Sequence, residues 1–394
     1  MLNKSCLGLL VSPLVSLLAT VVPVQAASVD PETQLLRIYD EISGNRLSKA
    51  LTLTEALLDE QPNFHLAQLI KGDLLLARTR SISTVGDLPN GPQDKLNDLR
   101  EEAQLRLRAY REKPPANAVP RYLLQLRPDQ KTAVVVDTKK SRLYVYENVD
   151  GRPRFLADFY ITQGKAGDGK TREGDEKTPI GVYHITGTLP RSKLGDFYGP
   201  MALPINYPNE WDRLQGRTGH GIWLHGVPSD TYSRAPRASN GCVVLANPDL
   251  EKLNRLVQIG LTPVIISDNI EWLDLDHWNN ERQSFLKTFE SWRADWESLD
   301  TEKYLAHYSK KFSSEDMNYA QWAEHKRRVN AGKEHIQVVT KNLSMLRNPG
   351  NDDMLVVTFD QDYRSSNLSH VMQKRQYWIR ENGQWRILHE GSAG

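Results

Sequence analysis

Ile222-Trp223-Leu224-His225-Gly226 and Ser239-Asn240-Gly241-Cys242-Val243 are the two stretches that say most about the fold and chemistry of this sequence. The first has the composition of a short strand that ends in a histidine–glycine pair, and the second that of a turn ending in a cysteine. Two prolines in the loop between them suit a chain reversal. A cysteine attacks as its thiolate, and a neighbouring imidazole can accept the thiol proton. Cys242 and His225 are therefore a candidate nucleophile and base.

The glycine before this cysteine also suits acyl chemistry. Gly241 lets a substrate approach the backbone closely, and the N–H groups of Gly241 and Cys242 are candidates to stabilise a developing oxyanion. The alternative is that Cys242 is an inert buried side chain, which is the commoner fate of a lone cysteine. The position of Cys242 in a Ser-x-Gly-Cys turn after a His-Gly strand end favours the reactive interpretation.

The N-terminus has the pattern of a secretory signal peptide over residues 1–26. Lys4 precedes an apolar run from Leu7 to Val24, and Val24-Gln25-Ala26 places small residues at the usual cleavage positions. The alternative is a membrane anchor, but two prolines and a serine interrupt the short run. We therefore expect an exported protein that is not an integral membrane protein after cleavage.

Export determines the state of the thiols. Of the two cysteines, Cys6 leaves with the signal peptide, so only Cys242 remains. Paired cysteines form disulfides in exported proteins, whereas a single thiol has no internal partner.

Charge and composition argue against several classes of protein. The chain has 394 residues, with 50 Lys and Arg against 49 Asp and Glu, and it lacks a long basic run. We therefore expect no nucleic-acid partner. No cluster of cysteines, or of histidines and carboxylates, has the spacing of metal ligands, so we expect no metal and no cofactor. His184 is interpreted as a structural or site-wall residue.

The chain divides into three parts after the signal peptide. Residues 28–115 are predicted to be helical, because apolar residues recur three and four apart over 47–58 and 64–77, and a charged helix covers 94–113. This pattern fits one tetratricopeptide-like unit or an ordinary helical hairpin. Residues 130–268 then show a period of two and are predicted to form a β-rich sandwich or barrel. The expected strands are 133–137, 142–146, 155–162, 181–186, 221–225 and 263–267.

The third part, residues 277–394, is predicted to be an α+β domain. Helical patterns over 278–299, 301–312 and 319–330 precede strand patterns over 336–346, 354–363, 371–380 and 385–389. The basic stretch 325–328 is interpreted as a solvated helix face.

Together, the His-Gly and Ser-x-Gly-Cys stretches resemble the signature of the L,D-transpeptidase (YkuD-type) catalytic domain. Lys177-Thr178-Pro179-Ile180-Gly181-Val182-Tyr183 matches the Thr-Pro-x-Gly-x-Tyr strand of that family, and Tyr207 lies in a segment that commonly contains a tyrosine. The resemblance covers about residues 130–268.

This resemblance implies a cysteine acyltransferase that acts on peptidoglycan. Cys242 attacks the L-to-D bond of a tetrapeptide stem, His225 is the base, and the carbonyl of Gly226 orients the imidazole. Transfer of the acyl group to an amine is L,D-transpeptidase chemistry, and transfer to water is L,D-carboxypeptidase chemistry. The implied location is the periplasm, in association with the cell wall.

The resemblance also suggests which residues contact the oxyanion or the substrate, namely Ser239, Asn240, Gly241 and Tyr207. One of these departs from the family pattern, since the family usually has Ser-His-Gly-Cys and this chain has Asn240 in place of the histidine. Asparagine forms hydrogen bonds but does not titrate near neutral pH. This change bears on acceptor and substrate preference more than on the Cys242–His225 pair.

The three-part order resembles a subgroup of these enzymes in which an NTF2-like domain follows the catalytic domain. That subgroup includes L,D-carboxypeptidases that help to maintain cell shape. The aromatic residues of the third part are interpreted either as a binding pocket or as core packing. The helical region is a candidate binding site for another wall enzyme. The alternative function is an inactive fold that binds peptidoglycan or a partner protein.

Overall fold

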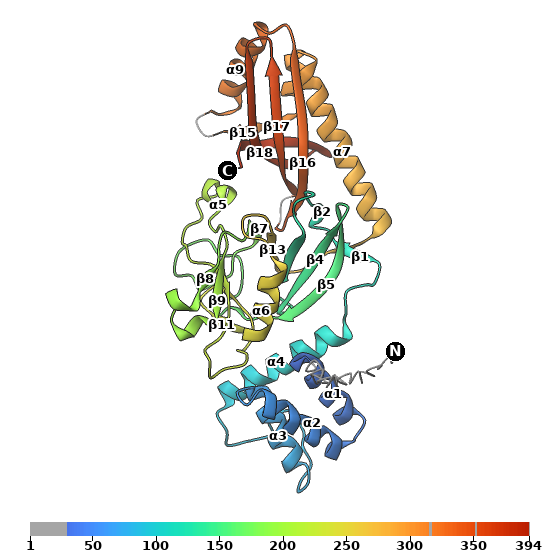
Figure 1. Cartoon of the computed structure of the whole chain (residues 1–394), viewed down its shortest axis with the longest axis vertical. Helices are drawn as coiled ribbons and strands as arrows, with labels where there is room; N and C mark the ends of the chain where they lie inside the picture. The colour runs from blue at the N-terminus through green and yellow to red at the C-terminus, as the bar shows by residue number, and fades with distance from the viewer. Residues whose placement is uncertain (1–29, 315–316, 351–352, 394) are drawn as a thin grey trace, which may run out of the picture.

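The chain has three consecutive folded parts, as the sequence predicts. The computed structural model describes residues 30–314, 317–350 and 353–393, and the predicted signal peptide lies outside these residues. The helical region, the β-rich domain and the α+β domain follow one another along the long axis of the molecule (Figure 1). Because the β-rich domain is in the middle, both of its neighbours contact it.

The helical region contains four helices that pack on one another. The predicted helical segments are confirmed. Asp30 caps the first helix, since its carboxylate accepts the N–H of Thr33 at 3.2 Å. Apolar residues such as Leu35, Leu57 and Ile70 form the shared core. The helices are α1 (Pro31–Ser43), α2 (Leu47–Glu60), α3 (His65–Leu76) and α4 (Gln93–Arg111).

The β-rich domain is built on a five-stranded sheet and a four-stranded sheet. Strands β3 and β13 run parallel in the first sheet, and its other neighbours are antiparallel. The first sheet has the order β5 (Arg152–Tyr160), β4 (Arg142–Val149), β3 (Thr132–Asp137), β13 (Pro263–Ser267) and β7 (Gly181–His184). The second has the order β12 (Val243–Val244), β10 (Trp223–His225), β9 (Met201–Pro204) and β8 (Leu189–Pro190).

Short elements complete this domain and connect its sheets. Apolar residues of both sheets and of α6, among them Val134, Leu224 and Leu250, share one buried core. This core holds the strand ends in fixed positions. The connecting elements are β6 (Gln163–Gly164), which pairs in parallel with β11 (Arg237–Ser239), the helices α5 (Glu210–Leu214) and α6 (Asn247–Leu256), and 3-10 turns at Arg191–Lys193 and Asp196–Tyr198.

The α+β domain has helices that pack on a curved antiparallel sheet (Figure 1). One prediction here was wrong, because 301–312 is not a single helix. The chain leaves the helical conformation after Leu305, and Tyr308–Ser313 forms a strand that pairs in parallel with β19. The elements are α7 (Leu275–Glu297), α8 (Thr301–Leu305), β15 (Tyr308–Ser313), α9 (Tyr319–Ala331), β16 (Ile336–Asn348), β17 (Met354–Ser365), β18 (Leu368–Glu381) and β19 (Gln384–Ser392).

The segment between the helical region and the β-rich domain is also structured. Strand β1 (Ala118–Pro120) pairs with β14 (Trp272–Asp274), and β2 (Leu123–Gln125) pairs with β16 as the edge strand of the C-terminal sheet. Strands β1, β2 and β14 have three residues each, which is too short for an alternating pattern to show in the sequence. The chain therefore contributes an edge strand to the C-terminal sheet before it enters the β-rich domain.

Candidate active site

Two adjacent parallel strands bring His225 and Cys242 to the same face of the four-stranded sheet. In the register of β10 and β12, Leu224 pairs with Val243 and His225 with Val244. Extended by one residue, this register places Cys242 opposite Trp223. Paired residues of neighbouring strands point to the same face, and successive residues alternate. His225, Trp223 and Cys242 therefore share a face.

The turn before Cys242 is shaped by Ser239 and Gly241. The hydroxyl of Ser239 donates to the carbonyl of Cys242 at 2.7 Å and accepts the N–H of Gly241 at 3.1 Å. Gly241 has a φ of 120°, and a Cβ atom there would lie 2.6 Å from the carbonyl oxygen of Lys177. Only glycine fits this backbone conformation and this space without strain.

These contacts bear on two of the predicted roles. The N–H of Gly241, which is predicted to face an oxyanion, donates to the hydroxyl of Ser239 in this structure. Ser239 is buried and holds the turn instead of facing a substrate. The N–H of Cys242 has no hydrogen-bond partner among the described residues, which leaves it as the candidate oxyanion donor of this turn.

The segment that contains Thr178 packs against the turn that precedes Cys242. Thr178 is fully buried, and its hydroxyl oxygen accepts the N–H of Gly164 at 2.9 Å. The preceding carbonyl, that of Lys177, lies against Gly241. Residues that are distant in sequence thus fix the position of the cysteine.

The imidazole of His225 is held in one orientation and one tautomer. Nδ1 lies 2.7 Å from the carbonyl oxygen of Gly226. Because a carbonyl can only accept a hydrogen bond, Nδ1 carries the proton and Nε2 is left as the acceptor. Gly226 has no room for a side chain, since a Cβ atom would collide with Oδ1 of Asn247. That oxygen accepts the N–H of Val227 at 2.9 Å.

Burial keeps both candidate catalytic groups neutral at rest. Burial lowers the pKa of His225 to about 4, partly opposed by the Gly226 carbonyl. It also raises the pKa of Cys242, although the N–H of Trp223 and the charges of Lys170 and Arg234 act in the opposite direction. The thiol Sγ lies 3.4 Å from the carbonyl oxygen of Gly221, and no hydrogen bond joins it to His225 in the described structure. Proton transfer from the Cys242 thiol to the imidazole therefore requires a change in these surroundings.

Two residues near this pair were not predicted from the sequence. Phe197 is 52% exposed, and its ring lies 6.2 Å from the imidazole of His225. The guanidinium of Arg234 lies 4.3 Å from the centre of the Phe197 ring, and its Nη2 donates to the carbonyl of Phe197 at 3.3 Å. No motif marks either residue, although Arg234 lies in the loop between His225 and Cys242 and Phe197 lies in the 3-10 turn Asp196–Tyr198.

Tyr207 and Asn240 occupy different environments. Tyr207 is buried and its hydroxyl donates to the carbonyl of Thr218 at 3.0 Å. Its ring packs edge-on against Tyr183 in the core of the domain, and its predicted substrate contact stays a prediction. Asn240 is exposed at the tip of the turn.

The described ranges lack the features of a metal site and of a membrane span. Within residues 30–314, 317–350 and 353–393, no three His, Cys, Asp or Glu side chains gather closely enough to hold a metal ion. His184 is half-buried in the wall of a cavity of about 120 Å³ between the β-rich and C-terminal domains, and burial lowers its pKa to about 4. No helix in these ranges combines the length and apolarity that a membrane span requires.

Comparison with known families agrees with this geometry. Residues 131–266 match the YkuD L,D-transpeptidase catalytic domain, and residues 284–391 match the Cds6 C-terminal NTF2-like domain. The chain therefore carries an L,D-transpeptidase catalytic domain. Enzymes with this domain act on peptidoglycan.

Two solved structures resemble the chain over most of its length. Bd1075 of Bdellovibrio bacteriovorus is 29% identical, with a TM-score of 0.62, and the match covers 70% of this chain and 98% of that one. The helical cell shape determining protein Pgp2 of Campylobacter jejuni is 27% identical, with a TM-score of 0.60, and the match covers 75% of this chain and 100% of that one. A comparison with curated protein sequences found no match.

Most aromatic residues of the NTF2-like domain belong to its core, as one of the two interpretations predicted. Trp292, Tyr304 and Trp378 are fully buried, and nearby aromatic side chains pack around them. Lys326 is an exception to the predicted solvated face, because it is half-buried with its Nζ 4.1 Å from the ring of Trp322. Burial lowers the pKa of Lys326 to about 8.

A large cavity lies away from Cys242. Its volume is about 1410 Å³, and it separates α1 and α4 of the helical region from strand β5 of the L,D-transpeptidase domain. Phe155 and Leu156 of β5 are partly exposed toward it. The residues that line this cavity do not include His225 or Cys242.

Proposed function

We propose that the protein is a peptidoglycan-directed cysteine acyltransferase, an L,D-transpeptidase or L,D-carboxypeptidase, with Cys242 as nucleophile and His225 as base. The observation that carries the proposal is the placement of both side chains on one sheet face, with Nδ1 of His225 committed to the carbonyl of Gly226. Nε2 is then the nitrogen that accepts the thiol proton.

The proposed reaction has two steps. Sγ attacks the carbonyl carbon of the L-to-D peptide bond, and its proton passes to Nε2 of His225. The C–N bond breaks, the departing nitrogen of the terminal D-residue takes the proton from the imidazole, and a thioester remains on Cys242. During this step the N–H of Cys242 faces the developing oxyanion.

The second step releases the acyl group. If water attacks the thioester, its hydroxyl joins the acyl carbon, its proton returns to Sγ through the imidazole, and a tripeptide stem is released. If an amine attacks, the product is a cross-link or an attached protein. We favour trimming by water, because the domain order resembles a subgroup that includes L,D-carboxypeptidases. Pgp2 is named as a helical cell shape determining protein, which supports a proposed role in cell shape.

The second candidate function is binding without catalysis. The observation that favours it is the absence of a hydrogen bond between Sγ and His225 in the described structure, together with neutral resting states of both groups. In that case the L,D-transpeptidase fold and the NTF2-like domain hold peptidoglycan or a partner protein.

Mass spectrometry of the protein incubated with tetrapeptide muropeptides tests these two functions. We expect tripeptide or cross-linked products from the unaltered protein and none from Cys242→Ala. Asp230→Ala is the matched control, because this exposed residue lies in the loop between His225 and Cys242 and is not among the residues assigned to the substrate. If stems bind but no product or thioester depends on Cys242, the enzymatic proposal is wrong and the binding function replaces it.

Location and recruitment belong to the same proposal. Removal of residues 1–26, export to the periplasm and association with the cell wall are supported by the N-terminal sequence pattern and by the peptidoglycan chemistry of the family. Cell fractionation with N-terminal sequencing tests them. Recruitment of another wall enzyme by residues 28–115 is tested by a pull-down with and without this region, and identical sets of captured proteins would contradict it.

A further inference from the structure

The helical region holds the loop that connects the two catalytic residues. We call this loop, residues 227–238, the strap. Its Tyr232 ring packs on Phe64 with ring centres 4.2 Å apart, and Tyr232 is buried in the core of the helical region. Asn63 adds two hydrogen bonds, as its carbonyl accepts the N–H of Tyr232 and its amide donates to the carbonyl of Ser229. The strap is therefore part of the helical region's packing as well as of the catalytic domain.

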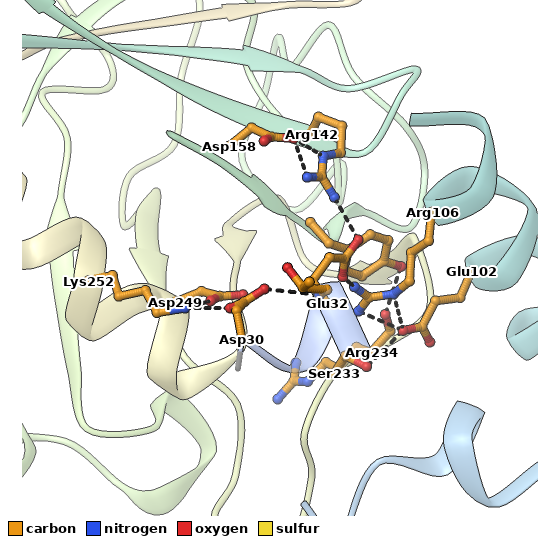
Figure 2. A network of polar contacts seen from close by, with 12 residues as sticks. Asp30, Glu32, Glu102, Arg106, Arg142, Asp158, Ser233, Arg234, Asp249 and Lys252 are labelled. Carbon is orange, nitrogen blue, oxygen red and sulfur yellow. Dashed lines mark hydrogen bonds and ion pairs between the residues drawn. The ribbon is translucent and has the colours of Figure 1, made fainter. Parts of the chain in front are cut away.

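A buried ionic network lies behind the strap (Figure 2). The hydroxyl of Ser233 donates to Glu102 of α4 at 2.8 Å, and the same carboxylate pairs with Arg106 at 2.9 Å. Arg106 also pairs with Glu32 of α1, which in turn pairs with Arg142 of β4 at 3.1 Å. Arg106 is 2% exposed and lies 3.9 Å from the centre of a tyrosine ring of β5. Because buried charges need their partners, this network fixes the position of Ser233.

The next residue of the strap, Arg234, reaches the active site. Its guanidinium lies against the Phe197 ring, which is itself beside the imidazole of His225. The positive charge of Arg234 acts to lower the pKa of both His225 and Cys242. No carboxylate among the described residues lies within ion-pair distance of this half-buried cation. A half-buried guanidinium without an anion is an incomplete site for a carboxylate.

Two lysines near the turn are paired with carboxylates. Lys170 is buried and pairs with Asp175 at 2.7 Å, and Lys165 pairs with Glu176 at 2.7 Å. Arg234 therefore differs from both lysines in having a free charge.

We propose that Arg234 binds the free carboxylate of the terminal D-residue of the stem, and that the helical region positions Arg234 for this contact through the strap. The proposal rests on the proposed function and specifies its substrate recognition. In a tetrapeptide the residue after the scissile bond is the last one, so its carboxylate is next to the carbonyl that Cys242 attacks. A planar guanidinium matches a carboxylate through two parallel hydrogen bonds.

Binding measurements in a protein that cannot turn over test Arg234 directly. In the full chain with Cys242→Ala, calorimetry compares a tetrapeptide stem that has a free terminal carboxylate with the same stem as its terminal amide. We expect the acid to bind at least about tenfold more tightly than the amide, since charge-assisted hydrogen bonds commonly account for such a factor. Addition of Arg234→Gln removes this preference, and Arg234→Lys restores part of it.

Two substitutions in the strap test the positioning role. Ser233→Ala removes the hydrogen bond to Glu102, and Tyr232→Leu removes the ring contact with Phe64. We expect both to reduce the acid-over-amide preference by several fold while amide binding changes little. Loss of folded structure would weaken the binding of the acid and of the amide equally. The ratio of the two affinities therefore separates a positioning effect from a folding effect. Trp211→Ala, at the opposite junction, is the control that leaves the ratio unchanged.

The outcomes distinguish this proposal from the proposed function. An acid-over-amide ratio that survives Arg234→Gln overturns the assignment of Arg234, whatever the activity. A ratio that survives both strap substitutions overturns the positioning role of the helical region. Product formation by the protein with Cys242 intact is measured separately, so the lack of products would contradict catalysis and not carboxylate binding.

Discussion

The L,D-transpeptidase domain meets the helical region and the NTF2-like domain through two different kinds of junction. The helical junction contains buried ion pairs around Arg106, together with the packing of Tyr232 on Phe64. The NTF2-like junction contains strand pairing of β2 with β16, a stacked pair of Trp211 and Tyr377 with ring centres 5.5 Å apart, and further contacts of α5.

The difference lies in which part of the catalytic domain each junction touches. Several contacts of the helical junction fall within the strap, between His225 and Cys242. The described contacts of the NTF2-like junction fall instead on α5 and β7 of the catalytic domain, and on β2, which precedes that domain. We therefore expect changes at the helical junction to alter the active site, and changes at the other junction to alter stability alone.

The largest effect is expected from Arg106→Met. This substitution leaves Glu102, which is 1% exposed, and Glu32 without their buried cation, so the free energy of unfolding falls by about 3–5 kcal/mol. The first transition in chemical denaturation measures it. The double variant Arg106→Met with Glu102→Leu recovers part of the loss, because it removes both buried charges. An unchanged first transition would show that the network does not hold the two parts together.

A smaller effect is expected from Trp211→Ala at the NTF2-like junction. Loss of the half-buried ring and its stacking on Tyr377 lowers the free energy of unfolding by about 1–2 kcal/mol. The rate of thioester formation at Cys242 stays within twofold of the original rate, as followed by mass spectrometry. A tenfold lower rate would remove the functional difference between the junctions.

Lys252→Met tests a more exposed part of the helical junction. Lys252 bridges Asp30 at 2.6 Å and Asp249 at 3.2 Å, but the side chains of Lys252 and Asp30 are each more than one-third exposed. Exposed ion pairs contribute little, so we expect a loss of less than about 1 kcal/mol that shrinks further at high salt. A loss as large as that of Arg106→Met would mean that burial does not distinguish the two networks.

The smallest effect concerns the pH dependence of acylation. Because burial lowers the pKa of His225 to about 4, the imidazole stays neutral and able to accept a proton above that pH. The acid limb of the acylation rate is therefore expected near pH 4, below the ordinary histidine range. Arg234 also lowers the pKa of His225, so Arg234→Gln moves this limb to higher pH, whereas Trp211→Ala leaves it in place. Stopped-flow acylation between pH 3.5 and 8 measures both, and a limb near 6.5 in the unaltered protein would contradict the role of burial.

The three-part fold could be predicted from the sequence because each part has its own apolar period. The exception is the segment 301–312, which is predicted as one helix. Tyr304, Tyr308 and Phe312 are four residues apart, which is typical of a helix face, and all three side chains are buried in one core. The chain nevertheless forms strand β15 from Tyr308, because pairing with β19 satisfies its backbone. Tertiary pairing of this kind leaves no local signal.

The candidate site could be predicted where its residues carry a local pattern. His225 and Cys242 occur in stretches of recognisable composition, and the strand register places them on one face. The contacts of Ser239 and Gly241 with each other could not be predicted, since a turn residue that bonds to its own backbone looks the same in sequence as one that faces a substrate. Arg234 was missed because its position depends on contacts with α3 and α4, more than a hundred residues earlier in the chain.

The shared packing of Tyr232 and Phe64 sets a limit on how this chain can be divided. A shortened chain that starts at residue 116 would expose the Tyr232 ring to water and would leave Arg142, which is 5% exposed, without Glu32. The strap would then lose the contacts that hold it between His225 and Cys242. We therefore expect that the L,D-transpeptidase domain is not portable on its own, and that a gene fusion or domain exchange has to carry the helices with it.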